Sequence, residues 1–209
     1  MMNVQQACGI VAAQRSKDSL LIATMGAMRA FDLLEADPSF INPAPKATRL
    51  SSVPLMGGAA GLGLGLALAR PERKVIVVDG DASLLMELSS LVTVAQADAG
   101  NLLHLLIKNG SQFTGLANLD APAPDFNFAE AARNAGYRHV YTIEDAAIWG
   151  ERFGEIQSLA GPVFVELTVE PAPSRAEEGF EQAEMPDYQF ERMGIEARAM
   201  QQLLNTGVL

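Results

Sequence analysis

An aspartate and an asparagine each follow an apolar segment of the chain, and their side-chain oxygens are the first candidates for chemistry. Asp81 comes shortly after the run Lys74–Val78. Asn109 comes shortly after the run Leu102–Ile107. If both runs are buried parallel strands, their carboxyl ends lie side by side at the sheet edge where α/β proteins bind ligands. A carboxylate and an amide oxygen are hard donors that suit Mg²⁺ bridging to a diphosphate, so the spacing predicts a magnesium site here.

The residues around Asp81 also predict a place for an anion. Asp79–Ala82 is expected to form a turn, and Ser83–Ala97 a helix with Ser83 as its N-cap. The backbone amides of Ala82 and Ser83 then open a helix, where free N–H groups and the helix dipole favour negative charge. A phosphate group bound beside the metal is therefore expected.

Apolar runs typical of strands alternate with segments typical of helices. The expected strands are Leu20–Met25, Lys74–Val78, Leu102–Ile107, His139–Thr142 and Pro162–Val169. The expected helices are Gly26–Leu34, Gly58–Ala69, Ser83–Ala97, Phe128–Ala135 and Asp145–Leu159. Loops are expected over the proline-rich Asp37–Ala47 and from Asn109 to about Asp125. This alternation predicts a three-layer α/β/α fold around a mostly parallel sheet of about six strands.

The composition fits one globular domain with a tail. The chain has 209 residues, of which 49% are hydrophobic and 19% charged, and this excludes wholesale disorder. We expect the domain over residues 1–171 and a partly helical tail over residues 172–209, with its helix at Phe190–Leu204. The formal net charge of -10 argues against nucleic-acid binding, which needs clustered basic residues. The single cysteine, Cys8, excludes an internal disulfide framework and favours a cytoplasmic protein.

No membrane segment or secretory signal is expected. The longest uncharged stretch, Leu50–Ala69, is nearly long enough to cross a bilayer. It contains Pro54 and five glycines, which weaken a helix in any solvent. We therefore expect a loop followed by a buried helix, Gly58–Ala69, whose small residues let another backbone approach closely.

The residues around Asp81 and Asn109 resemble the cofactor motif of thiamine-diphosphate enzymes. That motif is Gly-Asp-Gly followed by Asn a little under thirty residues later, and it stands here as Gly80-Asp81-Ala82 and Asn109. The resemblance implies that Asp81, Asn109 and the backbone carbonyl of Ser111 hold Mg²⁺.

Two residues depart from the family motif. Ala82 stands where relatives usually have glycine, and it would not fit if that position needed a positive φ angle. Lys108 stands where many relatives have the first residue of an Asn-Asn pair. Neither is a presumed metal ligand, and both leave open a non-catalytic relative that keeps the fold as a scaffold.

A second stretch carries the same resemblance. In the family, a bulky apolar residue before the metal motif props thiamine in its bent conformation, and Met56 occupies that position. The carbonyl of Pro54 would accept a hydrogen bond from the 4′-amino group, while amides after the first strand would contact the diphosphate. The expected cofactor contacts are Gly26, Ala27, Pro54, Met56, Gly80, Ala82 and Ser83. A role in the core is the alternative for Met56, and a core position is expected for His104.

The resemblance covers roughly residues 19–171, and it is closest to the small subunit of sulfopyruvate and phosphonopyruvate decarboxylases. The C-terminal domain of acetolactate-synthase-like enzymes is similar. The implied function is the thiamine-diphosphate- and magnesium-binding subunit of a heteromeric lyase that decarboxylates a small 2-oxo acid. The glutamate that activates the cofactor would come from a pyrimidine-domain subunit, in a hetero-oligomer or a homodimer. The alternatives are the cofactor subunit of a carboligase or of a 2-oxo acid oxidoreductase, and the scaffold.

Overall fold

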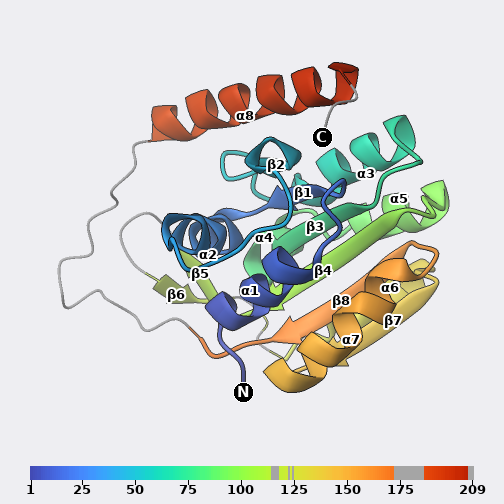
Figure 1. The fold of residues 1–209 in the computed structure, drawn as a ribbon. Coiled ribbons are helices and arrows are strands. Elements are labelled where there is room, and N and C mark those ends of the chain that lie inside the picture. Colours follow the sequence, from blue (N-terminus) through green and yellow to red (C-terminus); the bar gives the residue numbers. More distant parts are fainter. Residues whose placement is uncertain (114–117, 122, 124, 172–185, 207–209) are drawn as a thin grey trace.

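A six-stranded sheet lies at the centre of the computed structural model, which describes residues 1–113, 118–121, 123, 125–171 and 186–206 (Figure 1). The strand order is β2-β1-β3-β4-β8-β7, and every neighbouring pair is parallel. The strands are β1 (Leu20–Ala23), β2 (Arg49–Ser51), β3 (Val75–Gly80), β4 (Leu102–Lys108), β7 (His139–Ile143) and β8 (Val163–Thr168). The expected parallel sheet of about six strands is confirmed.

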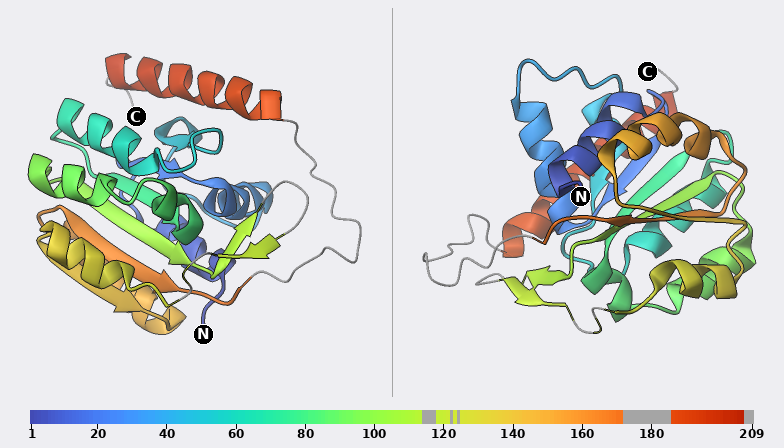
Figure 2. Two further views of the ribbon diagram at one scale, coloured as in Figure 1. Left: turned by 180° about the vertical axis from the view of Figure 1, so that it is seen from behind. Right: turned by 90° about the horizontal axis from the view of Figure 1, so that it is seen from below.

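Helices cover both faces of this sheet, which gives the expected three layers (Figure 2). One face carries α1 (Val4–Gln14), α2 (Met25–Ala36) and α7 (Ala146–Ser158). The other carries α3 (Ala59–Ala69), α4 (Asp81–Met86), α5 (Ser90–Ala97) and α6 (Phe128–Ala135). Successive residues of a strand enter opposite cores: Ile76 and Val78 of β3 pack in the first, and Val77 in the second. Burial on both faces explains why the central strands β3, β4 and β8 are largely apolar.

The remaining elements lie at the margins of the sheet. The last helix, α8 (Pro186–Thr206), packs along the edge strand β2 and includes the tail helix expected at Phe190–Leu204 (Figure 1). Residues 172–185 of the expected tail lie outside the described residues. A short antiparallel pair, β5 (Ser111–Phe113) and β6 (Asn118–Asp120), occupies part of the segment expected to be loop. A 3-10 turn, η1 (Lys46–Thr48), leads into β2.

The segment after β3 differs from the prediction. Asp79–Ala82 is not a separate turn, because Gly80 ends β3 and Asp81 begins α4. The single helix expected over Ser83–Ala97 is two helices, α4 and α5, which are separated near Glu87. Ser83 is not the N-cap, a position that Gly80 holds. Residues 87–89, between the two helices, include no proline or glycine, so the sequence alone indicates one continuous helix.

The glycine-rich helix α3 packs directly on the sheet, as its small residues predict. A Cβ atom added at Gly63 would lie 2.2 Å from Cγ2 of Val77, so only glycine allows this approach of α3 to β3. Gly61, on the opposite side of the helix, would meet no described atom within 4 Å. None of the helices in the described part of the chain is long and apolar enough to span a membrane.

Candidate metal and cofactor site

Asp81 lies at the carboxyl end of β3, where its side chain is buried and joined to the loop that follows β4. Its Oδ1 atom accepts a hydrogen bond from the amide of Ala82, and its Oδ2 atom accepts one from the amide of Gly110, both at 2.8 Å. Because β3 and β4 are neighbouring parallel strands, Asp81 and Asn109 meet at the same edge of the sheet, as expected.

Asn109 begins a tight turn that leads into β5. Its Oδ1 atom accepts a hydrogen bond from the amide of Ser111 at 2.9 Å, which is a side-chain mimic of a backbone turn. Gly110, between them, has a φ angle of 66°, a left-handed conformation that glycine adopts without strain. The turn holds Asn109 and Ser111 together, and the Gly110 amide joins it to the side chain of Asp81.

The electrostatic environment of Asp81 favours a bound cation. Burial raises the pKa of this carboxyl above its usual value, although the amides of Gly110 and Ala82 and the charge of Lys108 act in the opposite direction. Asp81 forms no ion pair within the described residues, so its charge is offset only by amides and a more distant lysine. Carboxylate, amide and carbonyl oxygens are the donors that Mg²⁺ prefers, and the residues present therefore fit this ion.

This donor set differs from a cluster of ionisable ligands. No group of three or more His, Cys, Asp or Glu side chains able to hold a metal occurs among the described residues. The predicted set needs only one such side chain, because Asn109 contributes an amide oxygen and Ser111 a backbone carbonyl.

Gly26 and Ala27 lie in the first turn of α2, which begins directly after β1. Thr24 is the N-cap of this twelve-residue helix, and its side chain makes no capping hydrogen bond to the helix. The first amides of a helix have no partner inside it, so those of Gly26 and Ala27 are suited to an anion. A Cβ atom added at Gly80 would lie 3.8 Å from the Oγ1 atom of Thr24, which brings this helix start next to the metal segment.

Pro54 and Met56 lie between β2 and α3, in a loop fastened to the start of α4. The amide of Gly57 donates a hydrogen bond to the Oγ atom of Ser83 at 3.0 Å. The Ser83 hydroxyl, inside α4, therefore anchors this loop instead of capping the helix. Met56 is 41% exposed and Leu55 is 38% exposed, so the alternative that Met56 belongs to the core is wrong.

The two departures from the family motif are compatible with the site. Ala82 lies inside α4 and is not among the residues with positive φ, so its position does not require glycine. The Nζ atom of Lys108 donates to the carbonyl of Phe126 at 3.0 Å and lies 3.5 Å from the carboxylate of Glu166. Lys108 therefore fastens the end of β4 to the segment before α6.

A buried polar chain behind the site was only partly foreseen. His104 is in the core, as expected, and its Nδ1 atom lies 3.0 Å from the hydroxyl of Tyr137. Its Nε2 atom lies 3.5 Å from Oδ2 of Asp79, whose Oδ1 atom accepts from the amide of Gly80 at 2.8 Å. The sequence does show Asp79 directly after one apolar run and His104 inside the next, and this pattern could have indicated a buried pair. The lateral register that joins them cannot be read from the sequence.

Comparison with known families identifies a matching domain. Residues 24–167 match the family described as thiamine pyrophosphate enzyme, C-terminal TPP binding domain. The matched range starts at Thr24 and ends in β8, so it contains all the predicted site residues and excludes α1 and α8.

Two similar proteins are named as decarboxylases. Phosphonopyruvate decarboxylase of Streptomyces viridochromogenes is 34% identical over 162 residues, which cover 76% of this chain and 38% of that protein. Sulfopyruvate decarboxylase subunit beta of Methanothermobacter thermautotrophicus is 37% identical over 122 residues, covering 56% of this chain and 59% of the subunit. The chain thus spans 38% of the first relative and 59% of the second, which is less than two thirds of each.

A solved structure supports the fold. The thiamine diphosphate-dependent 4-hydroxybenzoylformate decarboxylase of Rhodococcus jostii superposes with a TM-score of 0.65 at 18% identity. The superposition covers 81% of this chain and 33% of that protein. At this identity the likeness establishes the fold alone.

Proposed function

Because the chain belongs to the thiamine pyrophosphate enzyme family, as its C-terminal TPP binding domain, we propose that it binds thiamine diphosphate and Mg²⁺ for a 2-oxo acid decarboxylase. The observation that carries this proposal is the hydrogen bond between the Gly110 amide and the Asp81 carboxylate. It joins the two predicted metal segments at the carboxyl edge of the sheet. The names of the phosphonopyruvate and sulfopyruvate decarboxylases support the reaction.

Each segment at this edge has a proposed role. Asp81, Asn109 and the carbonyl of Ser111 would hold Mg²⁺. The amides of Gly26 and Ala27, at the start of α2, would bind the diphosphate. Gly80, Ala82 and Ser83 would contact the cofactor through other atoms, because the amides of Gly80 and Ala82 already donate to the side chains of Asp79 and Asp81. Met56 would support the bent thiamine, and the carbonyl of Pro54 would accept from its amino group. When bound, thiamine diphosphate supplies an electron sink for the negative charge left by loss of carbon dioxide.

The active site is proposed to be shared with a pyrimidine-domain subunit, which supplies the glutamate that activates the cofactor. One relative is itself named as a subunit beta, which supports a second subunit. Leu55, Met56 and Met86 are exposed apolar side chains close to Gly57, and a partner there would remove them from water. A cytoplasmic location is proposed from the single cysteine.

The test measures carbon dioxide release by the chain alone and by the chain mixed with a pyrimidine-domain subunit from the same organism. Thiamine diphosphate, Mg²⁺ and a panel of 2-oxo acids are supplied, beginning with sulfopyruvate and phosphonopyruvate. We expect turnover only in the mixture. Robust turnover by the chain alone would overturn the shared site. Tight cofactor binding by the mixture without release from any acid would instead favour carboligation or a scaffold.

A further inference from the structure

The C-terminal helix α8 lies outside the range matched by the family but is hydrogen-bonded to the strand that precedes Met56. The Oε2 atom of Glu196 accepts from the amide of Ser51 at 2.6 Å, and Oε1 accepts from the Ser51 hydroxyl at 3.1 Å. Ser51 ends β2, the edge strand of the sheet, and has β1 on only one side. The carboxylate therefore satisfies an outward-facing strand amide that lacks a neighbouring strand.

A second residue of α8 extends this contact to α2. Arg192 donates from Nε to Glu196 at 2.9 Å, and its two terminal nitrogens donate to the two carboxylate oxygens of Asp32, each at 2.8 Å. Asp32 lies on α2 and also accepts from Arg49 of β2 at 2.6 Å. The side chain of Arg49 is only 1% exposed. One ionic network thus joins α8, α2 and β2.

The two elements that this network holds both lead into the candidate cofactor site. β2 continues through Ser52, whose amide donates to the carbonyl of Ala23, into the loop that carries Pro54 and Met56. The first turn of α2 carries the amides proposed for the diphosphate. The network therefore sets how the thiamine-supporting loop lies relative to the diphosphate amides.

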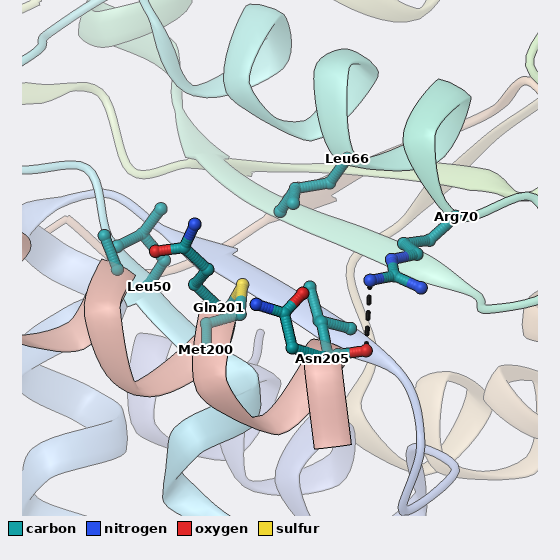
Figure 3. Close-up of a pocket in the computed structure, with 8 residues that line it drawn as sticks. Leu50, Leu66, Arg70, Met200, Gln201 and Asn205 are labelled. Atoms are coloured by element: carbon teal, nitrogen blue, oxygen red, sulfur yellow. Dashed lines mark hydrogen bonds between the residues drawn. The ribbon is translucent and has the colours of Figure 1, made fainter. Parts of the chain in front are cut away.

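The C-terminal half of α8 is attached in a different way. A cavity of about 230 Å³ separates it from α3 and β2 (Figure 3). Its wall includes Leu50, Leu66, Met200 and Asn205, and Arg70 crosses the gap to donate to the carbonyl of Leu204 at 3.0 Å. Met200 is buried and packs in the second core, so apolar contacts attach this half of α8, whereas the ionic network attaches the part nearer its N-terminus.

We propose that Glu196 and Arg192 are positioning residues of the cofactor site, which act through Ser51 and Asp32 on the loop carrying Met56. This inference rests on the proposed function. If α8 only stabilised the fold, loss of its contacts would speed amide exchange throughout the sheet. If α8 positions the site, the same loss should first speed exchange in the loop that carries Met56 and weaken cofactor binding.

The experiment compares Glu196→Ala and Glu196→Gln with Glu191→Ala, a control at an exposed position of the same helix. Amide hydrogen exchange of the full chain without ligand measures how often the loop that carries Met56 opens. We expect exchange over residues 51–58 to rise at least about tenfold in Glu196→Ala, because a charged hydrogen bond is lost. Glu196→Gln keeps one acceptor oxygen, so its exchange rate over residues 51–58 should lie between those of Glu196→Ala and the control. The control, and the amides of β3 and β4, should exchange as in the unmodified chain.

Calorimetric titration with thiamine diphosphate and Mg²⁺, in the presence of the pyrimidine-domain subunit, reports affinity. We expect Glu196→Ala to weaken the cofactor about tenfold while Glu191→Ala does not. Unchanged exchange over residues 51–58, or equally faster exchange throughout β3 and β4, would overturn the proposal. If the unmodified chain binds no cofactor, the proposed function fails, and exchange alone then decides whether Glu196 holds the loop.

Discussion

The amide of Gly110 donates a 2.8 Å hydrogen bond to Oδ2 of Asp81, across the boundary between two parallel strands. Each oxygen of this buried carboxylate has one amide donor and retains further acceptor capacity. The carboxylate is therefore held in place by backbone while it can still bind a cation. Its position depends on the register of β3 and β4, which the core of the sheet fixes.

Replacement of Asp81 by alanine should abolish stabilisation by thiamine diphosphate and Mg²⁺. At a ligand concentration 100-fold above the dissociation constant, binding stabilises a protein by about 2.7 kcal/mol, so the shift in melting temperature is measurable. Asp98→Asn, at an exposed residue before β4, is the control and should keep the full shift. The same shift in Asp81→Ala, or in the unmodified chain with excess chelator, would show that the metal ligands are assigned wrongly.

Met56→Ala should impair turnover without destabilising the chain. Because Met56 is 41% exposed, the free energy of unfolding should change by no more than about 0.5 kcal/mol. Misplaced thiamine should lower turnover of the complete enzyme by at least about tenfold at saturating cofactor. Leu68→Ala, at a residue that is 59% exposed on α3, is the matched control. Equal turnover of the two variants would remove Met56 from the site.

The sequence predicts five strands of the sheet, but it does not predict the edge strand β2. Continuous apolar runs such as that within Lys74–Val78 indicate strands buried on both faces, and the alternation with helices indicates a parallel sheet. β2 escaped prediction because it has three residues, Arg49, Leu50 and Ser51, of which only one is apolar. α1 escaped because it is rich in alanine and glutamine and has no clear apolar stripe.

The candidate site likewise has residues whose positions the sequence predicts and contacts that it does not predict. Asp81 and Asn109 could be placed together because each follows a strand, and strand ends define a common edge. The attachment of Gly57 to Ser83, and of Glu196 to Ser51, depends on how loops and α8 pack. Those contacts join residues that are distant in the sequence and have no local pattern, so only the structure shows them.

Two glycines near the site should respond to alanine in opposite ways. Gly57 has a φ angle of 86°, and a Cβ atom there would lie 3.1 Å from that of Glu87. Gly57→Ala should therefore cost about 1–3 kcal/mol and weaken cofactor binding. Gly61 is helical and has open space around it, so Gly61→Ala should stabilise the isolated chain by up to about 1 kcal/mol. Denaturant unfolding checks both, and a stable Gly57→Ala variant would show that the loop adapts.

Tyr137→Phe should destabilise the chain although it removes only one oxygen atom. Burial, and secondarily the charge of Asp79, raise the pKa of Tyr137 well above its usual value, so its hydroxyl stays protonated and can donate to Nδ1 of His104. Without this hydroxyl, the buried Nδ1 atom of His104 lacks a hydrogen-bond partner, which should lower the free energy of unfolding by about 1–3 kcal/mol. Tyr188→Phe, at a residue that is 52% exposed, is the control. Equal unfolding midpoints would mean that His104 finds another partner.

The attachment of α8 should weaken in acid through Asp32. Partial burial alone would raise the pKa of Asp32, but hydrogen bonds and charges from Arg192 and Arg49 lower it below its usual value. An acid whose pKa is lower in the folded chain contributes stability above its unfolded pKa, and loses it as the pH falls through the folded pKa. The difference in unfolding free energy between the unmodified chain and Asp32→Asn should therefore be largest near neutral pH.

That difference should narrow below about pH 4, where an ordinary aspartate takes up its proton. Denaturant unfolding of both proteins from pH 7 to pH 3 measures it, with Asp125→Asn at an exposed residue as the control. Protection of the amides of residues 51–58, corrected for the slower intrinsic exchange in acid, should fall in parallel in the unmodified chain, because Asp32 and Glu196 share Arg192. A difference that stays constant or widens with acid would show that the ion pairs of Asp32 do not hold α8.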